Sequence, residues 1–245
     1  MSRAIEMIDI EKIVIQLCKE IYQKEQKNID WLTASEDFFL NEIIVCIISS
    51  QCTYEMTLAV ADTLSKNGLS AYINNKKSKE DMIKDFLSIL TKNKISLYNE
   101  GVEKKVKVRF PRRNSNMIAS TIDNIYRKNL TIKDILKKSK HPRHARKLLI
   151  QSISGFGPKQ SSLFLRRIGY CNNLSILDSH IIDYLQLSQH IEIDKRKMCQ
   201  LQYYENIENI FINATKHFGY DVGCIDLAIW IAIRVLKKEG CLELR

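Results

Sequence analysis

The chain has 245 residues, with 38 Lys and Arg against 28 Asp and Glu, and a formal net charge of +10 at pH 7. This length allows one large domain or two modest ones, each with its own core. The positive charge favours a polyanionic partner, although a basic solvated surface without a partner would give the same balance. No apolar run approaches the about 20 residues that a membrane-spanning helix needs, and the charge-mixed N-terminus is unlike a signal peptide, so we expect no membrane partner.

The seven cysteines are scattered along the chain, and no two of them form a C-x-x-C pair. Several lie in apolar runs with helical spacing, so we expect reduced, mostly buried thiols in an intracellular protein. The scatter also argues against an iron–sulfur site with four cysteine ligands.

Apolar residues recur at helical spacing through almost the whole chain, which predicts an all-α protein. The segment 36–49 is apolar on most sides, as expected for a helix in the centre of a domain. The expected helices cover residues 8–23, 36–49, 54–67, 79–92, 115–128, 132–138, 142–152, 159–168, 200–218 and 222–236, and Asp178 opens one more. Residues 93–114 differ, because Val106, Val108 and Phe110 alternate with basic residues; a strand pair or an extended basic loop fits this segment better.

This order of elements predicts two helical lobes. Residues 35–175 would form a helical barrel that ends in the hairpin described below, and residues 1–34 and 176–245 would form the second lobe. An active site would then lie in the cleft between the lobes.

The stretch from Ile150 to His180 is the most informative part of the sequence. Gly155 and Gly157 bracket Phe156, which allows a sharp turn and a close approach of the backbone to a ligand. Pro158 fits the first position of a helix, whose free amides can hold a phosphate. Lys159 follows at once, and Asp178 stands nineteen positions later at a predicted N-cap. The structural alternative is a glycine turn between packed helices, with a surface lysine and a capping aspartate.

The sequence Gly-Phe-Gly-Pro-Lys, followed by an apolar helix and Ile-Leu-Asp-Ser-His, resembles the helix-hairpin-helix DNA glycosylase superfamily. The lysine after the hairpin is typical of its lyase-capable branch, which includes the archaeal-type 8-oxoguanine DNA glycosylases. The resemblance implies two helical lobes, a helix-hairpin-helix motif, an active site in the interlobe cleft, and Lys159 and Asp178 as catalytic residues.

Three other segments extend this resemblance from about Asp37 to Trp230. Gln51 occupies the position where the superfamily places a polar side chain in the gap left by the extruded base. Phe110, in an Arg-Phe-Pro segment, and Asp226 and Trp230, in Asp-Leu-x-x-Trp, are similar to base-pocket positions of the archaeal-type enzymes. The structural alternatives are a helix-ending turn for Gln51, and a helix-start charge and a core aromatic for Asp226 and Trp230.

The chemistry of base removal needs these two catalytic residue types. Cleavage of an N-glycosidic bond builds positive charge on the sugar, which the Asp178 carboxylate would stabilise. A neutral Lys159 amine would attack the anomeric carbon and form an imine, from which β-elimination cleaves the strand.

The basic residues near the hairpin are candidates for contact with the DNA backbone. Together with the hairpin amides at Gly155 and Gly157, we assign Arg143, Lys147 and His180 to DNA binding; Arg146 and Arg166 are further candidates. Any one of these charges, taken singly, can also be an ordinary solvated surface group.

We expect no catalytic metal and no required cofactor, because the histidines form no metal-ligand pair at helical spacing. The resemblance implies at most a structural alkali-metal ion at the hairpin, held by the backbone carbonyls of Gln151, Ile153 and Phe156.

The sequence therefore predicts a monomeric, cytoplasmic and nucleoid-associated enzyme of base excision repair. It would flip a damaged base, most simply 8-oxoguanine, out of double-stranded DNA, excise it and cleave the abasic site. Two alternatives stay open: a glycosylase of the same fold for another base, such as a bulky modified base of phage DNA, and a noncatalytic helix-hairpin-helix DNA-binding protein.

Two departures from the pattern of the archaeal-type enzymes make the identity of the excised base less secure than the reaction class. The chain runs nine residues beyond Leu236, and the interval from Lys159 to Asp178 is one residue longer than is usual in the archaeal-type enzymes.

Overall fold

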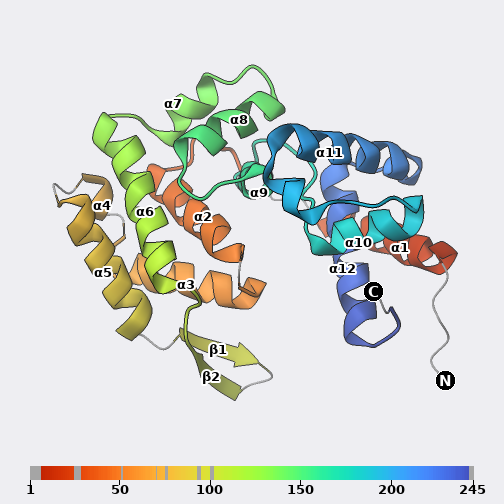
Figure 1. The fold of residues 1–245 in the computed structure, drawn as a ribbon, viewed down its shortest axis with the longest axis horizontal. Helices are drawn as coiled ribbons and strands as arrows, with labels where there is room; N and C mark the ends of the chain where they lie inside the picture. Colours follow the sequence, from red (N-terminus) through yellow and green to blue (C-terminus); the bar gives the residue numbers. More distant parts are fainter. Residues whose placement is uncertain are drawn as a thin grey trace. The chain divides into compact units, whose positions relative to one another are not determined.

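The computed structural model describes residues 7–24, 29–50, 52–69, 71–74, 77–92, 95–99 and 102–242. These residues form two compact units, one built from the described residues up to Ile29 together with those from Gly157 onward, and the other from Asp30 to Phe156. The described elements are helical apart from one β-hairpin, so the predicted all-α class is confirmed (Figure 1).

The central unit, Asp30 to Phe156, is built around α2. Nine of the fourteen residues of α2 are buried, as its apolar sequence predicts, and its N-cap Ser35 accepts a hydrogen bond from the Phe38 N–H. The elements of this unit are α2 (Glu36–Ser49), α3 (Tyr54–Lys66), α4 (Ala71–Asn74), α5 (Lys79–Lys92), β1 (Ile95–Asn99), β2 (Val102–Val106), α6 (Pro111–Ile125), η1 (Tyr126–Lys128), α7 (Ile132–Lys137) and α8 (Pro142–Ser152).

The β-hairpin falls in the segment where the sequence alternates with period two. β1 and β2 pair antiparallel, with Ile95 opposite Val106 and Asn99 opposite Val102. The extended segment ends earlier than predicted, because Pro111 fits the first turn of a helix and starts α6.

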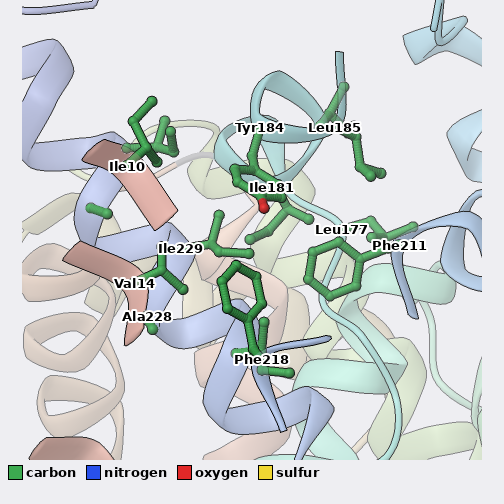
Figure 2. Packing of buried hydrophobic residues seen from close by; sticks show 14 of the residues in the cluster. Ile10, Val14, Leu177, Ile181, Tyr184, Leu185, Phe211, Phe218, Ala228 and Ile229 are labelled. Carbon is green, nitrogen blue, oxygen red and sulfur yellow. The ribbon is translucent and has the colours of Figure 1, made fainter. Parts of the chain in front are cut away.

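The second unit packs α1 against α12, and α10 against the same helix (Figure 1). Its elements are α1 (Met7–Lys24), α9 (Pro158–Arg167), α10 (Ser179–Gln189), η2 (Lys195–Cys199), α11 (Leu201–Thr215), η3 (Lys216–Phe218) and α12 (Val222–Lys238). One apolar core joins α1, α10, α11 and α12, and Figure 2 shows part of it, including Val14 of α1, Ile181 of α10 and Phe211 of α11. We call this unit the α1/α12 unit.

The division between the units differs from the predicted lobe boundaries at residues 35 and 175. The contacts place the second boundary after Phe156, so α9 and the loop that follows it belong to the α1/α12 unit. The reason is a buried ion pair: Arg166 of α9 is bound to Asp226 of α12, a partner 60 residues away that sequence spacing does not reveal.

The seven cysteines are free thiols, but only Cys18, Cys46 and Cys224 are buried, so the expectation of mostly buried thiols holds for three of them. Burial raises the pKa of Cys18, beside Cys224, to about 12. Among the described residues, no helix combines the length and the apolar character needed to cross a bilayer.

Candidate active site

Asp178 caps α10 with only one of its two carboxylate oxygens. Oδ1 accepts hydrogen bonds from the backbone N–H groups of His180 at 2.9 Å and Ile181 at 3.1 Å. These bonds satisfy two of the donors that a helix start leaves open. In the described part of the chain, Oδ2 accepts no hydrogen bond, and the residue is half-buried. The cap therefore fixes the carboxylate and leaves one oxygen for another use.

The segment before Asp178 is held by a buried ion pair between α9 and α12. The two guanidinium NH groups of Arg166 donate to the two oxygens of Asp226, and one of them also donates to the Leu174 carbonyl at 2.7 Å. Asp226 in turn accepts the Ile176 N–H at 2.8 Å. Burial opposes the charge of Arg166, but the Asp226 carboxylate outweighs it and raises the pKa of the guanidinium. The pair thus acts as a fixed charged clamp on the segment.

This clamp corrects two assignments made from the sequence. Asp226 is 3% exposed and its oxygens are taken by Arg166 and a backbone amide, so it is a structural residue and not part of a base pocket. Arg166 is bound in the same pair and is not a surface cation for DNA. Arg146 is fully buried as well, which removes it from the candidates for backbone contact.

Lys159 is the second residue of α9, and it is half-buried. Its ammonium group has no carboxylate within ion-pair distance among the described residues. Like Asp178, Lys159 belongs to the α1/α12 unit, so the structure places both predicted catalytic residues in one compact unit. An amine that is not held in an ion pair is sterically available to act as a nucleophile.

His180 and Trp230 form an aromatic contact in the same unit. Their rings meet edge to face with centroids 6.1 Å apart, and the guanidinium of Arg234 lies 4.8 Å from the centre of the Trp230 ring. Burial lowers the pKa of His180, against the opposing effect of Asp178, which favours the neutral imidazole.

The two hairpin glycines play different roles. Gly155 has φ +84°, the left-handed region that favours glycine, and a Cβ there would lie 2.5 Å from the Met117 sulfur. Gly157 has an extended backbone with φ −110° and room for a Cβ. Only Gly155 is therefore required by the turn, and the prediction that both glycines allow it is half correct. Phe156 between them is buried.

Phe110 is an exposed aromatic residue in a strained conformation. Its φ is 53°, its side chain is 48% exposed, and the Arg109 guanidinium lies 5.5 Å from the ring centre. The buried Asn114 side chain holds this bend by donating to the Arg109 carbonyl at 2.9 Å. A non-glycine residue with positive φ costs about 1–3 kcal/mol and is frequent at functional sites. Gln51, which the sequence predicts to enter the gap left by the extruded base, lies outside the described residues.

A long part of the chain around the hairpin carries only positive charge. Between Asp134 and Asp178 the sequence has nine Lys and Arg and no Asp or Glu. Of the predicted DNA contacts in this stretch, Lys147 is exposed and Arg143 is half-buried, both on α8. Lys137, Lys138 and Lys140, which the sequence did not single out, are also exposed, and none pairs with a carboxylate at ion-pair distance in the described part of the chain.

Comparison with known proteins identifies the family behind this arrangement. The family model for 8-oxoguanine DNA glycosylase matches residues 77–220, which include the hairpin, Lys159 and Asp178. The chain belongs to the 8-oxoguanine DNA glycosylase family.

Members of this family resemble the chain over nearly its whole length. An 8-oxoguanine DNA glycosylase/AP lyase of Korarchaeum cryptofilum is 25% identical over 223 residues, which cover 91% of this chain and 92% of that protein. The crystal structure of the Methanocaldococcus jannaschii 8-oxoguanine DNA glycosylase matches the fold with a TM-score of 0.68 and 22% identity, over 96% of this chain and 95% of that one. The same archaeal enzyme in complex with a 15mer DNA containing 8-oxoguanine matches with a TM-score of 0.64 and 22% identity, over 94% of this chain and 99% of that one.

The extension beyond Trp230 lengthens the last helix of this family member. α12 continues to Lys238, and Lys237 pairs with Asp183 of α10, a carboxylate that is 6% exposed and also bound by Lys195 at 3.2 Å. Cys241 and Leu242 pack against the core of the α1/α12 unit. Removing the residues after Leu236 would leave Asp183 with one partner fewer. A truncation there would therefore lower the stability of the protein in addition to any change in which base is excised.

We predict that Gly155→Ala and Gly157→Ala have unequal effects. Alanine at 155 must adopt a left-handed backbone and displace Met117, so we expect a destabilisation of about 1–2 kcal/mol and a melting temperature lower by several degrees. Alanine at 157 should leave the melting temperature within about 1–2 degrees, because its φ is ordinary and its Cβ has space. Thermal unfolding followed by circular dichroism measures both; equal losses would show that the turn does not depend on Gly155.

Proposed function

We propose that the protein excises 8-oxoguanine from double-stranded DNA and then cleaves the abasic site. The observation that carries this proposal is the geometry of Asp178: one oxygen is fixed by two backbone amides, and the other is uncommitted. A carboxylate that only capped a helix would not need Lys159 in the same unit, at the position where lyase-capable relatives carry their amine. Such an enzyme acts wherever the cell keeps its DNA, which for a prokaryotic cell is the nucleoid.

The glycosylase step uses the free oxygen of Asp178. As the bond between the base and C1′ breaks, the sugar gains oxocarbenium character and the base leaves with the bonding electrons and takes up a proton. A preorganised carboxylate stabilises that cation at no cost of reorganisation, which is where electrostatic catalysis is strongest.

The lyase step uses the amine of Lys159. The neutral amine adds to C1′ of the sugar cation and loses a proton; O4′ takes up a proton as the C1′–O4′ bond breaks, and the opened sugar is then joined to the lysine as an imine. The imine acidifies the C2′ hydrogen, and loss of that proton expels the 3′ phosphate by β-elimination. The same residue thus serves base removal and strand cleavage.

The charge distribution supports DNA as the partner. Residues 30–156 carry 22 Lys and Arg against 13 Asp and Glu, whereas the rest of the chain carries 16 against 15. Nearly all the net charge therefore lies in the central unit, which also carries the exposed Phe110. Exposed cations that lack a carboxylate partner favour a phosphate backbone, and an exposed aromatic beside a cation favours base stacking.

We also propose that the hairpin can hold an alkali-metal ion through the carbonyls of Gln151, Ile153 and Phe156. The Gln151 carbonyl, in the last turn of α8, accepts no backbone hydrogen bond among the described residues, and the Ile153 carbonyl accepts only a long one of 3.3 Å from the Phe156 N–H. Carbonyl oxygens suit such an ion, which would add positive charge near a bound phosphate. Among the described residues, no cluster of His, Cys, Asp and Glu is suited to a transition metal.

Asp178→Asn tests the electrostatic role of the carboxylate. Asn caps a helix about as well as Asp, so the melting temperature should change little. Release of 8-oxoguanine in a single turnover should fall by about two to three orders of magnitude, because the charge that stabilises the sugar cation is lost. If activity and folding are lost together, Asp178 is a structural cap and the proposed role is wrong.

Lys159→Gln tests the covalent step. Wild-type protein incubated with a duplex containing 8-oxoguanine and borohydride should form a stable protein–DNA adduct, and the variant should form none. Duplex affinity should stay within a few-fold of the wild type, since one half-buried amine contributes little to backbone binding. Full trapping by the variant would place the nucleophile elsewhere. If the wild type neither traps nor releases 8-oxoguanine but acts on a duplex with another modified base, the reaction class stands and the substrate is wrong.

The salt dependence of binding tests the exposed lysines at the end of α7 and just after it. Replacing Lys137, Lys138 and Lys140 with Gln should lower the slope of log affinity against log salt by up to about 0.9 per lost phosphate contact, that is by about 2–3 for an undamaged duplex. The matched control replaces Lys12, Lys66 and Lys84, which are each paired with an Asp one turn away. This control removes the same net charge and should leave the slope unchanged. An equal effect of the two triple variants would mean that Lys137, Lys138 and Lys140 act only through net charge and make no phosphate contacts.

A further inference from the structure

The buried polar face of α11 is not used by the mechanism above. Tyr204 and Glu208 lie one turn apart on this helix, and both side chains are fully buried. They share the buried stripe with Ile207 and Phe211, where an apolar residue would pack at no cost of desolvation. A tyrosine hydroxyl and a carboxyl group in that stripe therefore need partners.

Both groups find partners in the segment that leads to Asp178. The Tyr204 hydroxyl donates to the Ser175 carbonyl at 2.8 Å and accepts the Leu177 N–H at 2.9 Å. Glu208 accepts the Ser175 N–H at 3.0 Å through Oε1. With Asp226 on the Ile176 N–H, three consecutive backbone amides are bound by three buried side chains.

These bonds fix the register of the chain up to the catalytic carboxylate. The Asp178 N–H itself donates to the Ile176 carbonyl at 2.8 Å in a tight turn. The backbone N–H groups of residues 175–178 are therefore all hydrogen-bonded. A shift of the segment along its axis would break all of these bonds together. Apolar packing alone would bury the segment without setting its register in this way.

We propose that Tyr204 and Glu208 are positioning residues for base release, acting through the backbone of residues 175–177 to set the place of the Asp178 carboxylate. This inference rests on the proposed function. A displacement of about 1 Å at a catalytic group can lower the rate about 100-fold. Small changes in these two side chains should therefore lower the rate of base release more than they lower the stability of the fold.

Tyr204→Phe is the sharpest test, because it removes one oxygen atom. Single-turnover release of 8-oxoguanine should fall by about 10- to 100-fold. Borohydride trapping on a duplex with a ready-made abasic site should stay within about 3-fold of the wild type, because no glycosidic bond is broken there and Asp178 has no cation of that kind to stabilise. A purely structural role would lower both rates together, or neither.

The matched control is Tyr184→Phe on α10. Tyr184 is 1% exposed and belongs to the same core, but its hydroxyl makes no hydrogen bond to residues 174–178. The same chemical change at Tyr184 should leave both base release and trapping unchanged. Burial raises the pKa of the Tyr184 phenol, so the control removes a neutral hydroxyl group.

Glu208 supplies a second, independent pair of variants. Glu208→Gln keeps an oxygen acceptor for the Ser175 N–H and should keep base release within a few-fold of the wild type. Glu208→Leu removes the acceptor and should lower base release selectively, like Tyr204→Phe. Wild-type base release by both Tyr204→Phe and Glu208→Leu, with Asp178→Asn inactive, would overturn the positioning role and leave the proposed function standing. Absence of base release in the wild type would overturn both.

Discussion

A largely buried stretch of backbone that is neither helix nor strand must find hydrogen-bond partners elsewhere, and residues 174–177 are such a stretch. An unsatisfied buried amide costs about 1–3 kcal/mol, so several of them together would rival the net stability of a domain. The α1/α12 unit supplies the partners from three helices: Arg166 from α9, Tyr204 and Glu208 from α11, and Asp226 from α12. These helices converge on the segment, and the segment ends at Asp178. The same bonds that make the unit stable therefore place the carboxylate.

In the proposed mechanism, the α1/α12 unit performs the chemistry and the central unit attracts the DNA. The α1/α12 unit holds Lys159 and Asp178 and is almost neutral, with 16 basic against 15 acidic residues. The central unit carries the excess positive charge and the exposed Phe110. Long-range attraction to DNA does not need exact geometry, whereas stabilisation of a sugar cation does. Exposed lysines suit the first task, and a carboxylate fixed by backbone amides suits the second.

The sequence predicts much of this structure, for identifiable reasons. Helices such as α2, α5 and α8 have the predicted bounds because their apolar residues stand out from the polar segments around them and their starts are marked by Ser35, Ser78 and Pro142. The N-cap at Asp178 was predicted from local chemistry alone. The role of Lys159 as nucleophile follows from the resemblance, through its place after the hairpin, and stays a prediction.

The failures concern contacts between residues far apart in the chain. The sequence does not distinguish Arg166 and Arg146 from surface arginines, because their burial depends on residues far away in the chain. Asp226 matched a base-pocket position, yet its ion pair with Arg166 of α9 makes it part of the clamp on the segment before Asp178. Tyr204 and Glu208 did carry a sign that could have been used: a carboxylate on the apolar stripe of α11, four residues after a tyrosine, needs a buried partner. Gly157 shows the opposite error, since a glycine in a turn need not have positive φ.

The central claim is that buried side chains hold the backbone of residues 175–177 and so place Asp178. Amide hydrogen exchange of the wild-type protein, resolved by residue, tests it most directly. We predict that the N–H groups of Ser175, Ile176 and Leu177 exchange as slowly as those in the middle of α10 and α12, even though they lie outside any helix, because opening them requires the unit to unfold. Exchange at the rate of the exposed loop at Asn172 and Asn173 would contradict the claim, and with it the physical basis for the placement of the catalytic carboxylate.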